Sequence, residues 1–323
     1  MLRVGFPFSI DPQDEYRFLL ENGFDNSFSL KQRMYYGLLR PIMPLSMRHL
    51  LQKGANTRVP LKTDFIYDAL VKLVEDNVSH ESQSFKYNGT SDCAVVLTHD
   101  VDTKEGFDFI PHVIELEQKL GYRSSWNIVP YKYEIDKGII NLIREAGHEI
   151  GIHGYNHDGR LYLSEKVFNT RVPLINDAIR EYGAVGFRSP MVHRNLEWLQ
   201  KLQIQYDASC FDYDPFQPFP GGTGSIWPFV AGKFVELPYT LPQDHTLYWV
   251  LGKRDIAIWK SKAEWVAKHK GVILTLTHPD YLIEPRLLEM YSELLHFLRS
   301  IDNCWFCLPN RLAEFISTAL SRQ

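Results

Sequence analysis

From about residue 92 onward, short apolar runs alternate with longer segments whose apolar residues recur at helical spacing. The runs at 94–100 (AVVLTHD), 123–130 (RSSWNIVP) and 148–154 (HEIGIHG) are each followed by such a segment. This alternation indicates parallel strands joined by crossover helices. Seven or eight units of this kind continue to the C-terminus, and they predict an α/β fold that is a distorted (β/α) barrel rather than an open sheet.

Glycines stand where the predicted helices end, at Gly121, Gly147, Gly183 and Gly271. A glycine after a helix commonly adopts the left-handed conformation that stops it. The later strands are predicted within residues 186–190, 205–209, 233–239, 271–278 and 304–309. Residues 215–227 are rich in proline and glycine, so we expect a long loop there.

The first 90 residues do not share this alternation. They contain helical patterns at 12–23 and 64–76, and between them a basic, proline-interrupted stretch at 31–54. We predict an α-rich N-terminal extension, residues 1–90, that packs on a catalytic barrel formed by residues 91–323. For the basic stretch, a solvated helical face is favoured over binding of a phosphate-bearing substrate.

Composition and charge exclude several classes of protein. The chain has 323 residues, of which 45% are hydrophobic and 23% charged, as is typical of folded globular enzymes. A formal net charge of −4 without a long basic run argues against a nucleic-acid partner. No stretch approaches the roughly 18 apolar residues of a membrane span, and the N-terminus does not fit a signal peptide. We therefore predict a cytoplasmic protein, with no expectation for its oligomeric state.

The cysteines support the same compartment. Four in a chain of this length are too few for a disulfide framework, which agrees with a reducing environment. Cys304 and Cys307 have the spacing of a metal or redox pair, but they lie in a predicted strand, where residues three apart face opposite sides. Core packing is favoured for this pair.

Polar residues follow five of the predicted strands, at the end of the barrel where catalytic groups belong. These residues are Asp100 and Asp102, His153 and His157, Arg188, Asp207, and His278. Each one alone is more often structural or solvated. Their occurrence at successive strand ends favours one shared site.

The spacing of the carboxylates and histidines indicates a metal. Asp100 and Asp102 project to the same side of an extended chain, whereas His99 points away. Two converging carboxylates need cations, and His153 and His157, four residues apart, can bind a metal together with an aspartate and leave one position for water. Zinc suits these ligands, and cobalt, nickel, iron and manganese are compatible with the same ligand types.

The motifs of this chain resemble those of a known family. Five motifs follow, in order and spacing, the motif regions of the NodB-type polysaccharide deacetylases, carbohydrate esterase family 4. The motifs are THDVD (98–102), HGYNH (153–157), FRSP (187–190), YDAS (206–209) and LTH (276–278). The resemblance covers about residues 92–320, and H-x-x-x-H is its specific part. The first motif is the Asp-x-Asp variant, in which Val101 separates the two carboxylates.

The resemblance implies a NodB homology domain and metal-dependent hydrolysis of an N-acetyl group on an amino sugar. Asp100 would be the general base, Asp102, His153 and His157 the metal ligands, and His278 the general acid. The physical chemistry agrees, because a bound divalent metal lowers the pKa of its water towards about 7 and polarises the acetyl carbonyl. An imidazolium can then protonate the departing amine.

The resemblance also implies supporting residues. Arg188 would hold Asp100, and Asp207 would orient His278, with Asp212 and Asp214 as local competitors. The backbone N–H of Met191 would stabilise the oxyanion, and Pro190 and Tyr239 are assigned beside the substrate. The segment 236–244 is expected to wall the pocket. Trp126, Trp227 and Tyr239 are sugar-stacking candidates, but core packing is favoured for them.

Three other functions stay open. One is hydrolysis of another cyclic or linear C–N bond on the same fold, of which the metal-free kind is disfavoured by His153 and His157. Another is a non-haem iron oxygenase with two histidines and one carboxylate, which the strand–helix alternation disfavours. The last is a non-catalytic glycan-binding relative. Because a cytoplasmic enzyme does not reach mature cell-wall polymer, the expected substrate is an intermediate of surface-polysaccharide or glycoconjugate biosynthesis.

Overall fold

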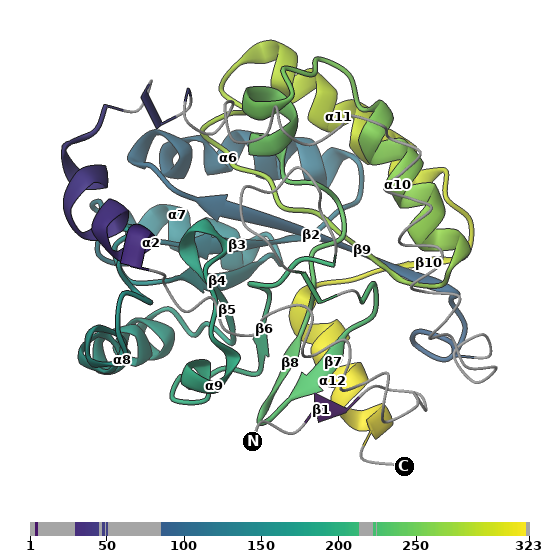
Figure 1. Ribbon diagram of the computed structural model, residues 1–323. Coiled ribbons are helices and arrows are strands. Elements are labelled where there is room, and N and C mark those ends of the chain that lie inside the picture. Colours follow the sequence, from purple (N-terminus) through teal and green to yellow (C-terminus); the bar gives the residue numbers. More distant parts are fainter. Residues whose placement is uncertain are drawn as a thin grey trace.

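The computed structural model describes residues 4–5, 30–44, 47–48, 50, 85–212, 222–223 and 225–320. The helices predicted at 12–23 and 64–76, most of the loop predicted at 215–227, and Asp214 lie outside the described residues. Figure 1 shows a curled sheet with helices arranged around its outer side. The polar strand ends predicted from the sequence all belong to this sheet or to the loops that follow it.

Ten strands form the sheet within the described residues, in the order β1-β7-β8-β6-β5-β4-β3-β2-β10, with β9 paired to β2. Their bounds are β1 Val4–Gly5, β2 Cys93–Val101, β3 Ser124–Ile128, β4 Glu149–His153, β5 Gly186–Arg188, β6 Tyr206–Asp207, β7 Phe229–Ala231, β8 Phe234–Glu236, β9 Val272–Leu274 and β10 Cys304–Phe306. All pairings are parallel except β1–β7 and β7–β8. Parallel strands place their carboxyl ends at one rim of the sheet.

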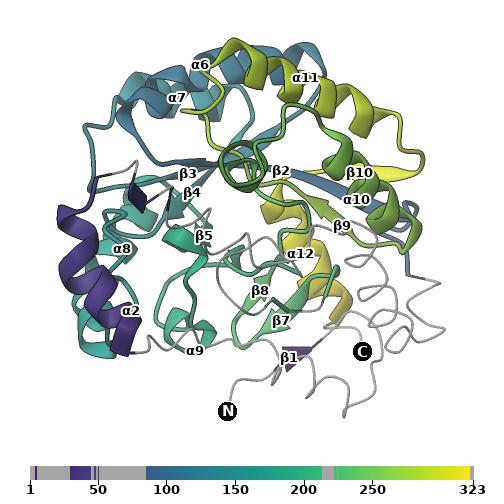
Figure 2. The ribbon, with the colours of Figure 1, turned by 45° about the horizontal axis from the view of Figure 1, so that its top comes forward.

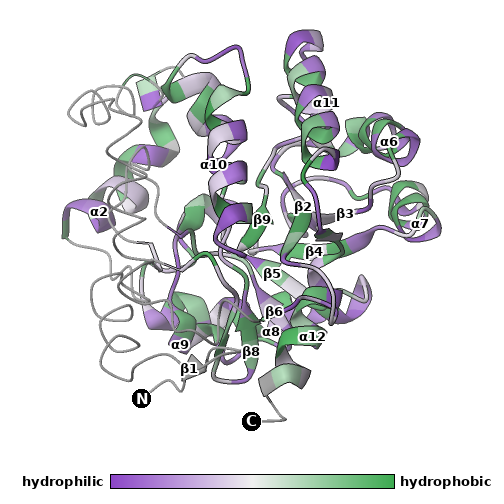
Figure 3. Ribbon diagram, turned by 90° about the vertical axis from the view of Figure 1, so that its right-hand side faces the viewer, coloured by the Kyte–Doolittle hydropathy of each residue, from purple (hydrophilic) through white to green (hydrophobic). Residues whose placement is uncertain are grey.

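The helices connect these strands. They are α2 Leu30–Met34, α6 Lys104–Lys119, α7 Lys137–Glu145, α8 Glu165–Glu181, α9 Leu196–Leu199, α10 Ala257–Lys268, α11 Pro285–Arg299 and α12 Pro309–Leu320. Shorter turns are η1 Tyr35–Leu39, η2 Arg40–Ile42, η3 Pro190–Val192 and η4 Thr246–Val250. Figure 2 shows helices such as α6, α7, α10 and α11 lying outside the strands. In Figure 3 hydrophobic residues gather on the strands and hydrophilic residues along these covering helices.

The sheet curls far enough for its two ends to meet. β2 pairs with β3 along residues 97–101 and with β9 along residues 94–96. On the far side, the chain after β8 reaches β9 as well, because the N–H groups of Thr240 and Leu241 both donate to the carbonyl of Leu274 at 3.2 Å. The predicted distorted (β/α) barrel is confirmed.

Side-chain caps explain where the crossover helices begin. Thr103 accepts a hydrogen bond from a backbone N–H in the first turn of α6, Asp136 does so for α7, and Ser164 for α8. An N-cap of this kind satisfies one of the donors that a helix leaves free at its start. α6 therefore begins just past the end of β2, and α8 begins after the loop that follows β4.

Three of the four glycines predicted to end helices have a positive φ: Gly121, Gly147 and Gly183. At the fourth place the left-handed residue is Lys270, with φ +58°. Gly271 is needed for space instead, since a Cβ there would lie 2.7 Å from a side-chain carbon of Ile226. The predicted end of this helix is correct, but the left-handed residue that ends it is Lys270 and not Gly271.

The core-packing prediction is confirmed for Cys307, which packs against the buried core, but it is wrong for Cys304. Cys93 and Cys304 form a disulfide, with Cα atoms 4.6 Å apart and a sequence separation of 211. The cause is the parallel pairing of β10 with β2, which sets Cys304 directly opposite Cys93. Cys304 therefore does not serve only to fill the core, whereas Cys210 and Cys307 are free thiols. A disulfide is typical of an oxidising rather than a reducing compartment.

Two further expectations concern the core and the membrane. Trp126 and Trp227 are at most 2% exposed, so the core-packing interpretation is confirmed for both and neither can stack on a sugar. None of the helices in the described ranges has the length and apolar character that crossing a bilayer requires.

Candidate metal centre and active site

Three predicted metal ligands come together at the rim of the sheet. Asp102 follows β2, His153 ends β4, and His157 lies in the loop after β4. Oδ1 of Asp102 lies 3.3 Å from Nε2 of His153 and 3.1 Å from Nε2 of His157. One ligand atom from each residue lies within 4.8 Å of the other two.

The chemistry of these atoms fits a divalent cation. Oδ1 of Asp102 is buried and has no hydrogen-bond partner, although two imidazole nitrogens lie close to it. Nδ1 of His153 lies 3.0 Å from the carbonyl oxygen of Arg188, which can only accept, so Nδ1 carries the proton and Nε2 presents a lone pair. Burial, which outweighs the attraction of Asp102, lowers the pKa of His157 and favours its neutral, metal-binding form.

Asp100 lies beside this centre in an ionised state. Its Oδ1 accepts hydrogen bonds from Nδ2 of Asn127 at 2.9 Å and from Nη1 of Arg188 at 3.3 Å. Its Oδ2 lies 3.8 Å from Nε2 of His153. Burial raises the pKa of Asp100, but attraction by neighbouring cations, among them Arg188 and His278, outweighs it and holds that pKa below its usual value.

Arg188 is fully buried and held from several sides. Besides Asp100, its guanidinium donates to Oγ1 of Thr98 at 2.8 Å and to the carbonyl of Ala208 at 2.7 Å. The predicted contact between Arg188 and Asp100 is therefore present. Asn127 was not predicted, although the register of β2 with β3 sets it directly opposite Asp100.

The carboxylate that contacts His278 is Asp244. Nδ1 of His278 lies 2.6 Å from Oδ1 of Asp244, and the backbone N–H of His278 donates to Oδ2 of the same residue at 2.6 Å. Burial opposes protonation of the ring, but Asp244, with Asp102 and Asp100 behind it, raises the pKa of His278 to about 10. The prediction that Asp207 orients His278 is wrong.

Asp207 and its competitor Asp212 have other partners. β6 pairs with β8 so that Asp207 lies opposite Glu236, and both carboxyl groups are fully buried. Burial, followed for Glu236 by the charge of Asp207, raises both pKa values and favours a protonated carboxyl in this pair. Asp212 forms a buried ion pair with Lys262, with Nζ and Oδ2 2.8 Å apart.

The three residues predicted on the substrate side, Met191, Pro190 and Tyr239, differ in their surroundings. Met191 lies in η3, just after β5, with φ +59°, a left-handed conformation that non-glycine residues seldom adopt. Pro190 is buried against Gly154, where a Cβ would lie 2.4 Å from the proline ring. Tyr239 is 1% exposed, with its ring beneath the guanidinium of Arg188 at 5.9 Å. Its assignment to substrate contact is therefore wrong.

His99 points away from the metal ligands, as predicted. Its ring is buried, stacks on Trp126 with centroids 4.1 Å apart, and bonds Glu117 and Thr277, each at 2.8 Å. Alternation along β2 therefore sends Asp100 to the site and His99 to the layer between sheet and helices.

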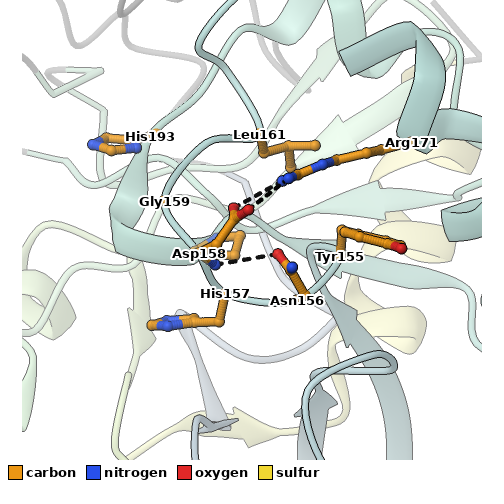
Figure 4. Close-up of a pocket in the computed structure, with 9 residues that line it drawn as sticks. Tyr155, Asn156, His157, Asp158, Gly159, Leu161, Arg171 and His193 are labelled. Carbon is orange, nitrogen blue, oxygen red and sulfur yellow. Dashed lines mark hydrogen bonds and ion pairs between the residues drawn. The ribbon is translucent and has the colours of Figure 1, made fainter. Parts of the chain in front are cut away.

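A small pocket lies beside the metal ligands, and Figure 4 shows its lining. It is bounded by residues 155–159, Leu161, Arg171, Pro190 and His193. Asp158 and Arg171 form a two-point ion pair across it, with N–O distances of 2.8 and 2.6 Å. The loop that supplies His157 is thus one wall of this pocket.

Comparison with known proteins supports the family resemblance. No protein-family profile matches the chain. The peptidoglycan deacetylase of Helicobacter pylori is 22% identical over 243 residues, which cover 64% of this chain and 82% of that protein. A putative polysaccharide deacetylase of Mycobacterium smegmatis superposes with a TM-score of 0.58 and 18% identity, over 72% of this chain and 93% of the other. The allantoinase PuuE superposes with a TM-score of 0.57 and 13% identity, over 71% and 91%.

These relatives confirm the predicted resemblance to the polysaccharide deacetylases and the predicted fold. The prediction of an enzyme that hydrolyses carbon–nitrogen bonds other than peptide bonds is confirmed with them. The structural likeness by itself concerns the fold, since the allantoinase superposes about as well as the deacetylase.

Proposed function

We propose that this chain is a NodB-type polysaccharide deacetylase that removes an N-acetyl group from an amino sugar with the help of a bound divalent metal. The observation that carries the proposal is the unpaired Oδ1 of Asp102 between the Nε2 atoms of His153 and His157. An ionised carboxylate, Asp100, and a protonated imidazole, His278, complete the site. Hydrolysis of an amide needs these three functions together.

Asp102, His153 and His157 would hold the metal, and zinc is the metal we propose because two histidines and one carboxylate are a common set of catalytic zinc ligands. A divalent ion in this position supplies a Lewis acid for the acetyl carbonyl and acidifies a bound water. His153 is prepared for the task by the carbonyl of Arg188, which fixes its tautomer.

Asp100 is proposed as the general base. Its carboxylate is ionised, and Asn127 and Arg188 both bond Oδ1, which leaves Oδ2 for the proton of the attacking water. Arg188 in this scheme is a positioning residue, since it holds the carboxylate rather than the reacting atoms. The backbone N–H of Met191 is proposed as the oxyanion donor.

His278 is proposed as the general acid that protonates the leaving amine. Asp244 holds the ring through Nδ1, so the proton on Nε2 is the one that is transferred. By raising the pKa of His278, Asp244 keeps the ring charged through the neutral pH range. Segment 236–244, predicted as a wall of the pocket, supplies this residue.

For the substrate we propose an N-acetylated amino sugar within a glycan or within an intermediate of its biosynthesis. The Helicobacter pylori relative is named for peptidoglycan and the Mycobacterium smegmatis structure for polysaccharide, which supports a glycan substrate. Cytoplasmic placement is opposed by the Cys93–Cys304 disulfide. Thiol counting on protein quenched with an alkylating agent directly from cells distinguishes the compartments.

The decisive experiment combines metal analysis with acetate release. Purified chain is assayed on a panel of N-acetylhexosamines, their oligomers and polymers, and on cyclic ureides and imides as the alternative substrates. We expect about one equivalent of metal and acetate release from an acetylated sugar. His153→Ala should lose both, and His296→Ala, an exposed histidine on α11, should lose neither. Full metal content and activity in His153→Ala would overturn the proposal.

A further inference from the structure

The loop after β4, which carries His157, has an unusual backbone. Gly154, His157 and Gly159 have φ values of +67°, +58° and +79°. A left-handed conformation is unfavourable for a residue with a Cβ, and it persists only where surrounding contacts impose it. The geometry of one metal ligand therefore depends on what holds this loop.

On its barrel side the loop is held by α8. Arg171 grips the carboxylate of Asp158 at two points, and Asp158 directly follows His157 (Figure 4). This contact restrains the residue after the ligand. It does not reach Gly159 or Arg160, where the loop turns back.

On the opposite side the loop is held by the N-terminal segment. Nη1 of Arg40 donates to the carbonyl of Asp158 at 3.0 Å. Arg160 donates to the carbonyl of Gly37 through Nη2 at 2.9 Å and to that of Tyr36 through Nε at 3.4 Å. These bonds join residues that are 118 to 124 positions apart in the chain.

Tyr36 is the buried side chain through which this segment packs on the loop. It is 6% exposed and is the only buried residue of α2 and η1, whereas Leu38 on the same turn is 67% exposed. Its ring packs edge-on against His193, with centroids 4.7 Å apart. A Cβ on Gly159 would lie 2.8 Å from a ring carbon of Tyr36 and 2.9 Å from the sulfur of Met191.

We propose that residues 36–40, here called the brace segment, hold the His157 loop in its metal-binding conformation. The proposal rests on the proposed metal site and adds a positioning role for the N-terminal extension. Tyr36 occupies the space above Gly159 that a side chain would otherwise fill, while the bonds of Arg40 and Arg160 fix the backbone on both sides of it. The sulfur of Met191, the proposed oxyanion residue, lies close to the same glycine.

The expected effect is on metal affinity. Contacts that orient a metal ligand from outside typically change affinity by about 10- to 100-fold when removed. We expect Tyr36→Ala to weaken zinc binding by about this factor, and Arg160→Ala to do the same without altering the brace segment itself. Tyr36→Phe keeps the ring and should bind zinc nearly as the unmodified chain does. Leu38→Ala, an exposed neighbour, is the matched control.

Zinc affinity is measured on the metal-free, full-length proteins by competition with a chromophoric chelator, without substrate. Thermal unfolding of the same samples shows that each variant is folded. Amide hydrogen exchange of residues 154–160 is compared with that of β4 in the metal-free state, and we expect faster exchange in the loop alone for Tyr36→Ala. This second measurement needs no metal.

Two results would overturn the proposal. One is that Tyr36→Ala unfolds at a lower temperature but keeps both its zinc affinity and the hydrogen-exchange protection of the loop. The other is that Leu38→Ala loses as much zinc affinity and loop protection as Tyr36→Ala. Failure of the proposed function looks different. If the unmodified chain binds zinc but releases no acetate, the deacetylase proposal fails and the affinity series still decides the role of the brace segment. If the unmodified chain binds no zinc, the hydrogen-exchange comparison decides whether the brace segment holds the His157 loop.

Discussion

The two halves of the candidate site are held in place in different ways. Asp100 lies in β2, Asp102 directly follows that strand, and His153 ends β4, so the backbone ladder of the sheet sets their positions. His157 and Asp244 lie in loops, and side chains from distant parts of the chain hold them. The positions of the strand-borne groups therefore follow from the local sequence, while those of the loop-borne groups depend on tertiary contacts.

The largest effect is expected at the strand-borne base. Asp100→Asn keeps the hydrogen bonds to Oδ1 but cannot accept a proton, so we expect turnover to fall by about 1,000-fold, within the usual range for general-base removal. Metal content should stay at the level of the unmodified chain, because the metal is assigned to Asp102. Elemental analysis and initial rates check both points. Loss of metal instead would exchange the roles of Asp100 and Asp102.

A smaller effect is expected at the loop-borne partner of the acid. Asp244→Asn removes the carboxylate that raises the pKa of His278, so that pKa falls below about 10. Because His278 must be protonated to act, the loss of activity with rising pH should begin at lower pH, and turnover at neutral pH should drop by about 100-fold. The pH profile of kcat is the measurement.

The control for this prediction is Asp207→Asn. Asp207 accepts a hydrogen bond from Ser209 and lies opposite Glu236 rather than beside His278, so the alkaline limb of the Asp207→Asn profile should stay in place even where the rate or stability changes. An alkaline limb that moves in Asp207→Asn and not in Asp244→Asn would restore the assignment made from the sequence.

The smallest effect on the site is expected from removing the disulfide that joins β2 to β10. Cys304→Ser should lower the free energy of unfolding by about 2–5 kcal/mol, because the bond closes a very long loop. Zinc affinity should stay unchanged, since the ladder to β3 and β9 still places Asp102. Urea unfolding and zinc titration test the two parts, with Cys307→Ser as the free-thiol control. Weakened zinc binding would show that the strand-borne half also depends on remote contacts.

Much of the site could be predicted because its residues follow recognisable strands. The two-residue period of β2 separates Asp100 from His99, and the structure keeps that separation. The four-residue spacing of His153 and His157 indicated a shared metal, and the two rings do converge on Asp102. Such patterns work because side-chain direction along a strand is a local property of the backbone.

The errors share one cause, which is pairing between elements that are remote in sequence. Asp207 was expected to meet His278, but the register of β6 with β8 gives it to Glu236, and Asp244 reaches His278 instead. Cys304 was expected to pack in the core, but the pairing of β10 with β2 sets it opposite Cys93, with which it forms a disulfide. Tyr239 was assigned to the substrate, but it lies beneath Arg188.

The amino-acid sequence alone therefore determined the strand–helix order, the ends of the strands and the identity of the charged groups placed there. Local propensity and side-chain alternation suffice for these features, because each depends on neighbours within a few residues. Only the tertiary structure decided which carboxylate partners which histidine, which cysteines join, and that Tyr36 lies over the His157 loop. Those choices depend on sheet register and loop packing, which bring together residues 34 to 211 positions apart and leave no periodic trace in the chain.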